Sequence, residues 1–170
     1  MRAILTIAGL SVLTGSAALA DTMEIEVAIP RLDVAEYHRP YVAVWVANAD
    51  QSVAANLAVW YQQEKRGADA GETWLKDLRQ WWRRSGRFLE MPVDGISGPT
   101  KAPGAHRIVL DTDKGPLAWL APGNYTLVVE AAREVGGREM VSVPFTWPLV
   151  AAKGAEGTRE LGRVSLSLRD

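Results

Sequence analysis

Short runs of β-branched and aromatic residues, separated by turn residues, constrain the fold of this chain more than any other feature. Residues 41–47 (YVAVWVA) have the composition of a central β-strand. Turn-forming residues follow at 48–50, and residues 53–61 then predict the partner strand of an antiparallel hairpin. Because side chains alternate along a strand, we expect one face of this second run to carry Leu57, Val59 and Tyr61.

Similar runs recur along the rest of the chain and bring the total to seven or eight short strands. They are residues 23–29, 106–110, 125–131, 140–147 and 161–168. Turn signals separate several of them, such as Pro30 after the first run and Gly136-Gly137 before the fourth. This pattern is typical of a mainly β fold. We expect an antiparallel β-sandwich of the immunoglobulin-like or transthyretin-like kind.

Residues 73–84 interrupt the strand pattern and predict one inserted, Trp-rich helix with Thr73 as its N-cap. Its apolar stripe consists of Trp74, Leu75, Leu78, Trp81 and Trp82. We expect Trp74 in the core, together with either Trp81 or Trp82. Adjacent residues on a helix point about 100° apart, so the second member of that pair is open to a ligand or partner.

The first twenty residues have the character of a secretory signal peptide. Arg2 precedes an apolar run over residues 3–13, and Ala18-Leu19-Ala20 is a small-x-small cleavage site. The apolar run is too short to span a bilayer. We therefore expect cleavage after Ala20, export to the periplasm, and one β-sandwich domain over residues 21–170 without a transmembrane segment.

Composition excludes several classes of function. The chain has no Cys, which rules out disulfides, thiolate metal sites and a cysteine nucleophile. Its formal net charge of -1 gives no argument for nucleic acid as a partner. No Ser-His-Asp order, paired catalytic carboxylates or phosphate loop is recognisable in the sequence. We therefore expect an electron carrier or a binding module rather than an independent catalyst.

Residues 94–100 (DGISGPT) carry the clearest functional signal. Their glycine and proline content predicts a loop. Gly95 and Gly98 leave room for the close approach of another enzyme, because glycine has no side chain. Ser97 and Asp94 can order the turn through hydrogen bonds between their side chains and the backbone.

This motif resembles the acceptor signature that FAD:protein FMN transferases modify outside the bacterial cytoplasm, with Pro99 where the usual pattern has Ala. In that chemistry the acceptor hydroxyl, here that of Thr100, attacks the pyrophosphate of FAD. AMP leaves, and FMN stays on the threonine through a phosphoester. The resemblance implies covalent FMN as the cofactor and such a transferase as a partner. The expected cofactor-binding residues are Thr100, Asp94, Gly95, Ser97, Gly98, Trp81 and Trp82.

Several sequence blocks together resemble a family of predicted periplasmic proteins known as domain of unknown function 2271. The blocks are residues 39–46 (RPYVAVWV), 74–83 (WLKDLRQWWR), 94–98, 122–127 and 130–134. The resemblance implies a small secreted β-rich protein, of a kind often associated with periplasmic membrane reductases and flavin-transfer enzymes. We expect a flavinylated electron carrier that works with a membrane reductase. The alternative is a non-redox β-sandwich that binds a partner or small ligand in the same compartment.

Overall fold

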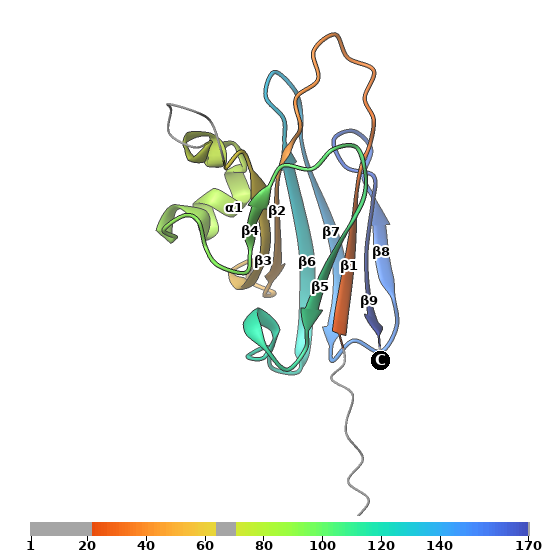
Figure 1. Ribbon diagram of the computed structural model, residues 1–170. Coiled ribbons are helices and arrows are strands. Elements are labelled where there is room, and N and C mark those ends of the chain that lie inside the picture. The colour runs from red at the N-terminus through yellow and green to blue at the C-terminus, as the bar shows by residue number, and fades with distance from the viewer. Residues whose placement is uncertain (1–21, 64–70, 170) are drawn as a thin grey trace, which may run out of the picture.

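The computed structural model describes residues 22–63 and 71–169, which form nine strands in two sheets. The strands are β1 (Thr22–Ile29), β2 (Tyr41–Ala47), β3 (Val53–Tyr61), β4 (Ser97–Pro99), β5 (Gly104–Asp111), β6 (Gly123–Ala132), β7 (Arg138–Trp147), β8 (Lys153–Glu156) and β9 (Arg163–Arg169). One sheet has the order β5-β1-β9-β8 and the other has the order β4-β3-β2-β6-β7. The sheets face each other (Figure 1), which confirms the predicted mainly β sandwich.

Antiparallel pairing dominates both sheets, as expected, with one exception at an edge. β4 runs parallel to β3, with Val59 opposite Ser97 and Tyr61 opposite Pro99. Neither β4 nor β8 was predicted from the sequence. The predicted signal peptide and its cleavage position lie outside the described residues. Within those residues, no helix combines the length and apolar character needed to cross a membrane.

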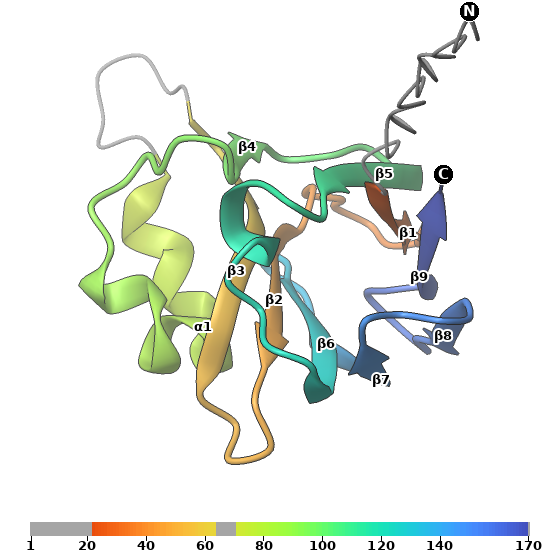
Figure 2. The ribbon, with the colours of Figure 1, turned by 90° about the horizontal axis from the view of Figure 1, so that it is seen from below.

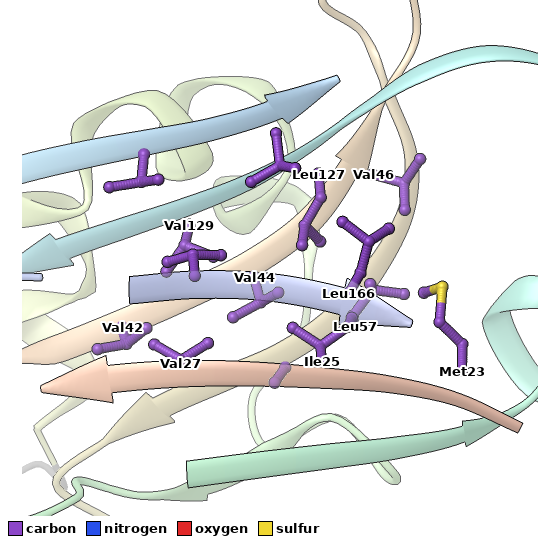
Figure 3. Packing of buried hydrophobic residues seen from close by; sticks show 14 of the residues in the cluster. Met23, Ile25, Val27, Val42, Val44, Val46, Leu57, Leu127, Val129 and Leu166 are labelled. Carbon is purple, nitrogen blue, oxygen red and sulfur yellow. The ribbon is translucent and has the colours of Figure 1, made fainter. Parts of the chain in front are cut away.

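The main core lies between the two sheets and follows the alternation seen in the sequence. β1 contributes Met23, Ile25 and Val27, all fully buried. Figure 3 shows the side chains of Ile25 and Val27 directed toward those of Val42 and Val44 from β2, on the opposite sheet. Burial of such aliphatic side chains stabilises the fold by about 1.5–3 kcal/mol for each fully buried residue.

A second core covers the outer face of the five-stranded sheet. It joins the other faces of β2, β3 and β6 to a helical segment over residues 72–88. Figure 2 shows this segment against β3, on the side of the sheet away from β1 and β9. The central strand β2 is therefore buried on both faces, which explains its continuous apolar sequence.

A β-bulge in β3 overturns the expectation that Leu57, Val59 and Tyr61 share one face. Val44 pairs with Ala58 while Trp45 pairs with Asn56, so Leu57 is an extra residue in the ladder. Leu57 and Ala58 both enter the core between the sheets, whereas Val59 and Tyr61 face the helical segment. One inserted residue reverses the facing of everything beyond it, because the side-chain period of a strand is two.

The helical segment is not the single helix predicted for residues 73–84. It consists of a 3₁₀ helix η1 (Glu72–Asp77), a short helix α1 (Arg79–Arg84) and a 3₁₀ helix η2 (Gly86–Phe88). Leu78 separates η1 from α1 with a non-helical ψ of 69°, and it is fully buried. Gly71 occupies the N-cap position of η1 and there is no side-chain cap, so the predicted role of Thr73 is wrong.

This break changes which tryptophans are buried. Trp74 is 52% exposed, which contradicts its predicted place in the core. Trp81 is completely buried and Trp82 is half-buried, which confirms the expected inequality of that pair. A 3₁₀ helix has three residues per turn rather than the 3.6 of an α-helix, and the helical segment changes direction at Leu78. For both reasons a stripe with a period of 3.6 does not stay on one face.

Candidate functional site

The predicted acceptor motif runs along an edge of the five-stranded sheet. The backbone N–H of Val59 donates to the carbonyl oxygen of Ile96 at 2.7 Å, and Ser97, Gly98 and Pro99 form β4. The prediction of a loop throughout this stretch is therefore wrong at its centre. The strand was not recognised in the sequence because Gly98 and Pro99 are residue types that are unfavourable in the interior of a strand.

A tight turn precedes this strand and is closed by Ser97. The Ser97 hydroxyl oxygen accepts a hydrogen bond from the backbone N–H of Val93 at 2.8 Å, while the Ser97 N–H donates to the Val93 carbonyl at 3.0 Å. Gly95, inside the turn, has a φ of 78°, a value that favours glycine. The role predicted for Ser97 is thus observed. The Asp94 side chain is exposed and makes no hydrogen bond to any described residue, so the prediction that it orders the turn is wrong.

Thr100 follows β4 directly and lines a cavity of about 590 Å³. The cavity collects residues from separate parts of the chain, among them Tyr37, Arg39, Tyr41, Trp74, Asp77 and Thr100. Small-molecule sites in proteins usually have volumes of about 300–1,000 Å³ and combine aromatic walls with a few polar groups. This cavity has a volume within that range, and its largely polar lining includes the aromatic side chains of Tyr37, Tyr41 and Trp74.

Two of the aromatic residues are positioned through one backbone carbonyl. The Gly71 carbonyl oxygen accepts hydrogen bonds from the Tyr41 hydroxyl and from the backbone N–H of Trp74, both at 3.1 Å. A side chain at Gly71 would collide with the Tyr41 hydroxyl and with Gln62. Burial raises the pKa of the Tyr41 hydroxyl, so this group remains a neutral donor at physiological pH.

A buried ion pair supports the wall formed by the end of β6. Arg133 Nε donates to Glu160 Oε2 at 2.8 Å, and the two side chains are only 6% and 5% exposed. The same carboxylate accepts a hydrogen bond from the Gly137 N–H at 2.9 Å. Tyr37 lies nearby, and burial raises the pKa of its hydroxyl. That hydroxyl is buried without a hydrogen-bond partner among the described residues.

Of the seven residues predicted to bind a cofactor, only Thr100 lines this cavity. Asp94, Gly95, Ser97 and Gly98 form the turn and strand that lead to it. Trp81 is enclosed within the protein, where its indole N–H donates to Asn56 Oδ1 at 2.8 Å, and no face of its ring is open to a ligand. Trp82 packs beside Trp81 with ring centroids 6.4 Å apart and is not among the residues that line the cavity.

Trp74 is instead the tryptophan that shares the cavity with Thr100. Sequence reasoning missed this, and it also missed Tyr37, Arg39 and Tyr41 as site residues. No local pattern marks those residues, because Tyr37 and Arg39 from the β1–β2 connection and Tyr41 from β2 meet at the cavity only in the folded chain. In the described part of the chain, no three acidic or histidine side chains gather closely enough to hold a metal ion.

The family model described as "Predicted periplasmic protein (DUF2271)" matches residues 22–163. The chain belongs to this DUF2271 family. The matched range contains the helical segment, the acceptor motif and every residue that lines the cavity. The resemblance in the sequence blocks is thereby confirmed at the level of the family. Among curated proteins and solved structures, none matches this DUF2271 protein.

Proposed function

We propose that this DUF2271 protein carries FMN covalently on Thr100 and transfers electrons between a membrane reductase and a periplasmic acceptor. One observation carries the proposal: the last residue of the acceptor motif lines the same cavity as Trp74 and Tyr41. When bound, FMN supplies the redox chemistry, and the protein supplies position and environment.

The residues at the cavity fit such a group. Trp74 is half-exposed, with Lys76 Nζ 5.9 Å from the centroid of its ring, and aromatic faces stack well on planar rings. Tyr41 adds a second aromatic ring, which is held by the hydrogen bond from its hydroxyl to the Gly71 carbonyl oxygen. Thr100 lines the same cavity, which supports a phosphoester at this residue together with a ring against Trp74.

In the attachment step, the Thr100 hydroxyl is the nucleophile. Its oxygen forms the new bond to the FMN phosphorus, the pyrophosphate bond of FAD breaks, AMP leaves, and the hydroxyl proton passes to solvent. An FAD:protein FMN transferase provides the catalysis. The protein's own contribution is the position of β4, where Pro99 lies opposite Tyr61 directly before Thr100.

The test is co-expression with a flavin transferase, followed by intact mass and in-gel fluorescence under denaturing conditions. The wild type should gain the mass of FMN, Thr100→Ala should not, and Thr100→Ser should retain part of the modification. Pro99→Ala should keep or raise the yield, and Asp94→Ala should lower it. Ser142→Ala, an exposed hydroxyl on β7, serves as the control and should be modified fully. An unmodified wild type beside a modified known acceptor would overturn the proposal.

A non-redox binding module is the second candidate, and the pairing of β4 favours it. Ser97, Gly98 and Pro99 are held against β3, whereas a transferase requires access to its acceptor. In this case the cavity binds a ligand or partner without any covalent change at Thr100. Intact mass therefore separates the two candidates directly.

Both candidates act in the periplasm after removal of the signal peptide. The family description and the sequence of residues 1–20 support this location. N-terminal sequencing of the exported protein should begin at Asp21. Recovery of an uncleaved chain from the cytoplasm would contradict it.

A further inference from the structure

We infer that the cavity beside Thr100 selects a planar ligand that carries an anionic group and a ring N–H donor, with Arg39 as the counter-ion and Asp77 as the acceptor. This inference rests on the proposed function, because it assigns the recognition chemistry of the same cavity. It concerns non-covalent binding, however, and can be tested without any modification of Thr100.

Most of the charged side chains that line the cavity are already paired within the protein. Arg133 is committed to Glu160 in the buried ion pair. His38 lies 2.9 Å from Glu36 Oε1 and 3.6 Å from Glu134 Oε2. A ligand that paired with any of these groups would have to compete with an existing partner, so they are poor candidates for recognition.

Arg39 and Asp77 differ from the others. Both are exposed, both line the cavity, and neither forms a hydrogen bond or ion pair with any described residue. They have opposite charges, yet no ion pair joins them within 4.0 Å. A cation and an anion that share a cavity but remain apart leave space for a ligand that contacts both.

The chemistry of these two groups defines the ligand. A guanidinium presents a planar fork of donors that matches a phosphate or carboxylate. A carboxylate such as that of Asp77 only accepts hydrogen bonds, so its complement is an N–H or O–H group. Trp74 is half-exposed and lines the same cavity as Tyr41, and aromatic rings of this kind stack well on a planar body. FMN has all three features, whereas riboflavin lacks the phosphate.

The test uses the full exported chain produced without a flavin transferase, with its unmodified mass confirmed. FMN and riboflavin are titrated separately at low salt, and binding is followed by quenching of tryptophan fluorescence. We expect Arg39→Gln to weaken FMN binding by about tenfold or more, because a charge-assisted hydrogen bond is lost, while riboflavin binding stays unchanged. Asp77→Ala should weaken riboflavin binding. Arg31→Gln, an exposed cation outside the cavity lining, is the matched control and should alter neither affinity.

Each variant is checked for an unchanged melting temperature, so that loss of folding is not read as loss of binding. Equal effects of Arg39→Gln on FMN and riboflavin, or no binding of either flavin by the wild type, would overturn the inference. The proposed function fails separately: Thr100 could remain unmodified beside an active transferase while the selectivity due to Arg39 is still observed. Conversely, a modified Thr100 with no selectivity at Arg39 would retain the function and remove this inference.

Discussion

The carboxylate of Glu130, on β6, accepts a hydrogen bond from the backbone N–H of Trp81 at 2.9 Å. It also accepts from the N–H of Gln80 at 3.1 Å and from Arg138 Nε at 2.8 Å, and its side chain is completely buried. Two of the free N–H groups in the first turn of α1, those of Gln80 and Trp81, are thus satisfied by a side chain from the sheet. This carboxylate attaches the helical segment, and with it Trp74, to the sandwich.

Replacement of Glu130 should therefore release the helical segment. We expect Glu130→Ala to lower the free energy of unfolding by about 3–5 kcal/mol, because buried donors lose their charged acceptor. Hydrogen exchange at the amides of Gln80 and Trp81 should accelerate. Glu156→Ala, which removes an exposed ion pair with Arg163, should cost about 0–1 kcal/mol and is the control. Similar costs for the two variants in urea unfolding would contradict this role.

The tryptophans of the helical segment should differ sharply in their contribution to stability. Trp81→Ala removes a completely buried side chain and should cost about 3–5 kcal/mol. Trp74→Ala removes a half-exposed side chain and should cost less than about 1 kcal/mol. Chemical denaturation of both variants tests the difference. A larger loss of unfolding free energy for Trp74→Ala than for Trp81→Ala would instead support a place for Trp74 in the core, as helical periodicity alone predicts.

The Glu139 carboxylate should make stability depend on pH in the acidic range. Burial acts to raise the pKa of this group, but the N–H donors of Leu161, Thr158 and Arg159 outweigh it and hold the pKa below its ordinary value of 4.5. A carboxyl with a lowered pKa stabilises the fold fully above its unfolded pKa. That contribution is lost as the pH falls through the folded value.

Glu139→Gln should consequently be less stable than the wild type at neutral pH. The difference in unfolding free energy should shrink as the pH falls below 4.5 and should vanish below the lowered pKa of the folded protein, where the wild-type carboxyl is also neutral. Urea unfolding of both proteins across this range measures it. A difference that stays constant with pH would show that shape, rather than charge, matters at this position.

The turn before β4 should depend on Gly95 more than on Gly98. Gly95 has a φ of 78°, and a side chain in this conformation costs about 1–2 kcal/mol. A Cβ at Gly98 would lie 3.4 Å from Trp60 Cδ1, at the boundary of ordinary contact, and there the backbone conformation is not restricted to glycine. Gly95→Ala should thus lower the melting temperature more than Gly98→Ala does. The reverse order would contradict the turn geometry.

The parts of the fold that sequence reasoning predicted are those where local pattern and burial agree. Residues 41–47 form β2 with the predicted bounds, because a strand buried on both faces must be apolar along its whole length. β8 was missed because Lys153–Glu156 is a short edge strand with exposed polar residues. The bulge at Leu57 was missed because alternation assumes an unbroken ladder.

The candidate site was predictable only at Thr100, where a motif marks the residue. The aromatic partner was assigned to Trp81 or Trp82 because a continuous helix was assumed, and the break at Leu78 places Trp74 at the cavity instead. Arg39 and Asp77 are far apart in the sequence and carry no pattern. Their shared cavity follows from the packing of η1 beside the start of β2.

Thr100 lies in the short connection that leads from Pro99 at the end of β4 to Gly104 at the start of β5. Both ends of this connection belong to strands in different sheets, so a group attached to Thr100 cannot move far from the cavity. Short tethers of this kind produce effective concentrations in the millimolar range. The cavity could therefore bind a free ligand too weakly to hold it in dilute solution. The same ligand, once bonded to Thr100, would still occupy the cavity most of the time.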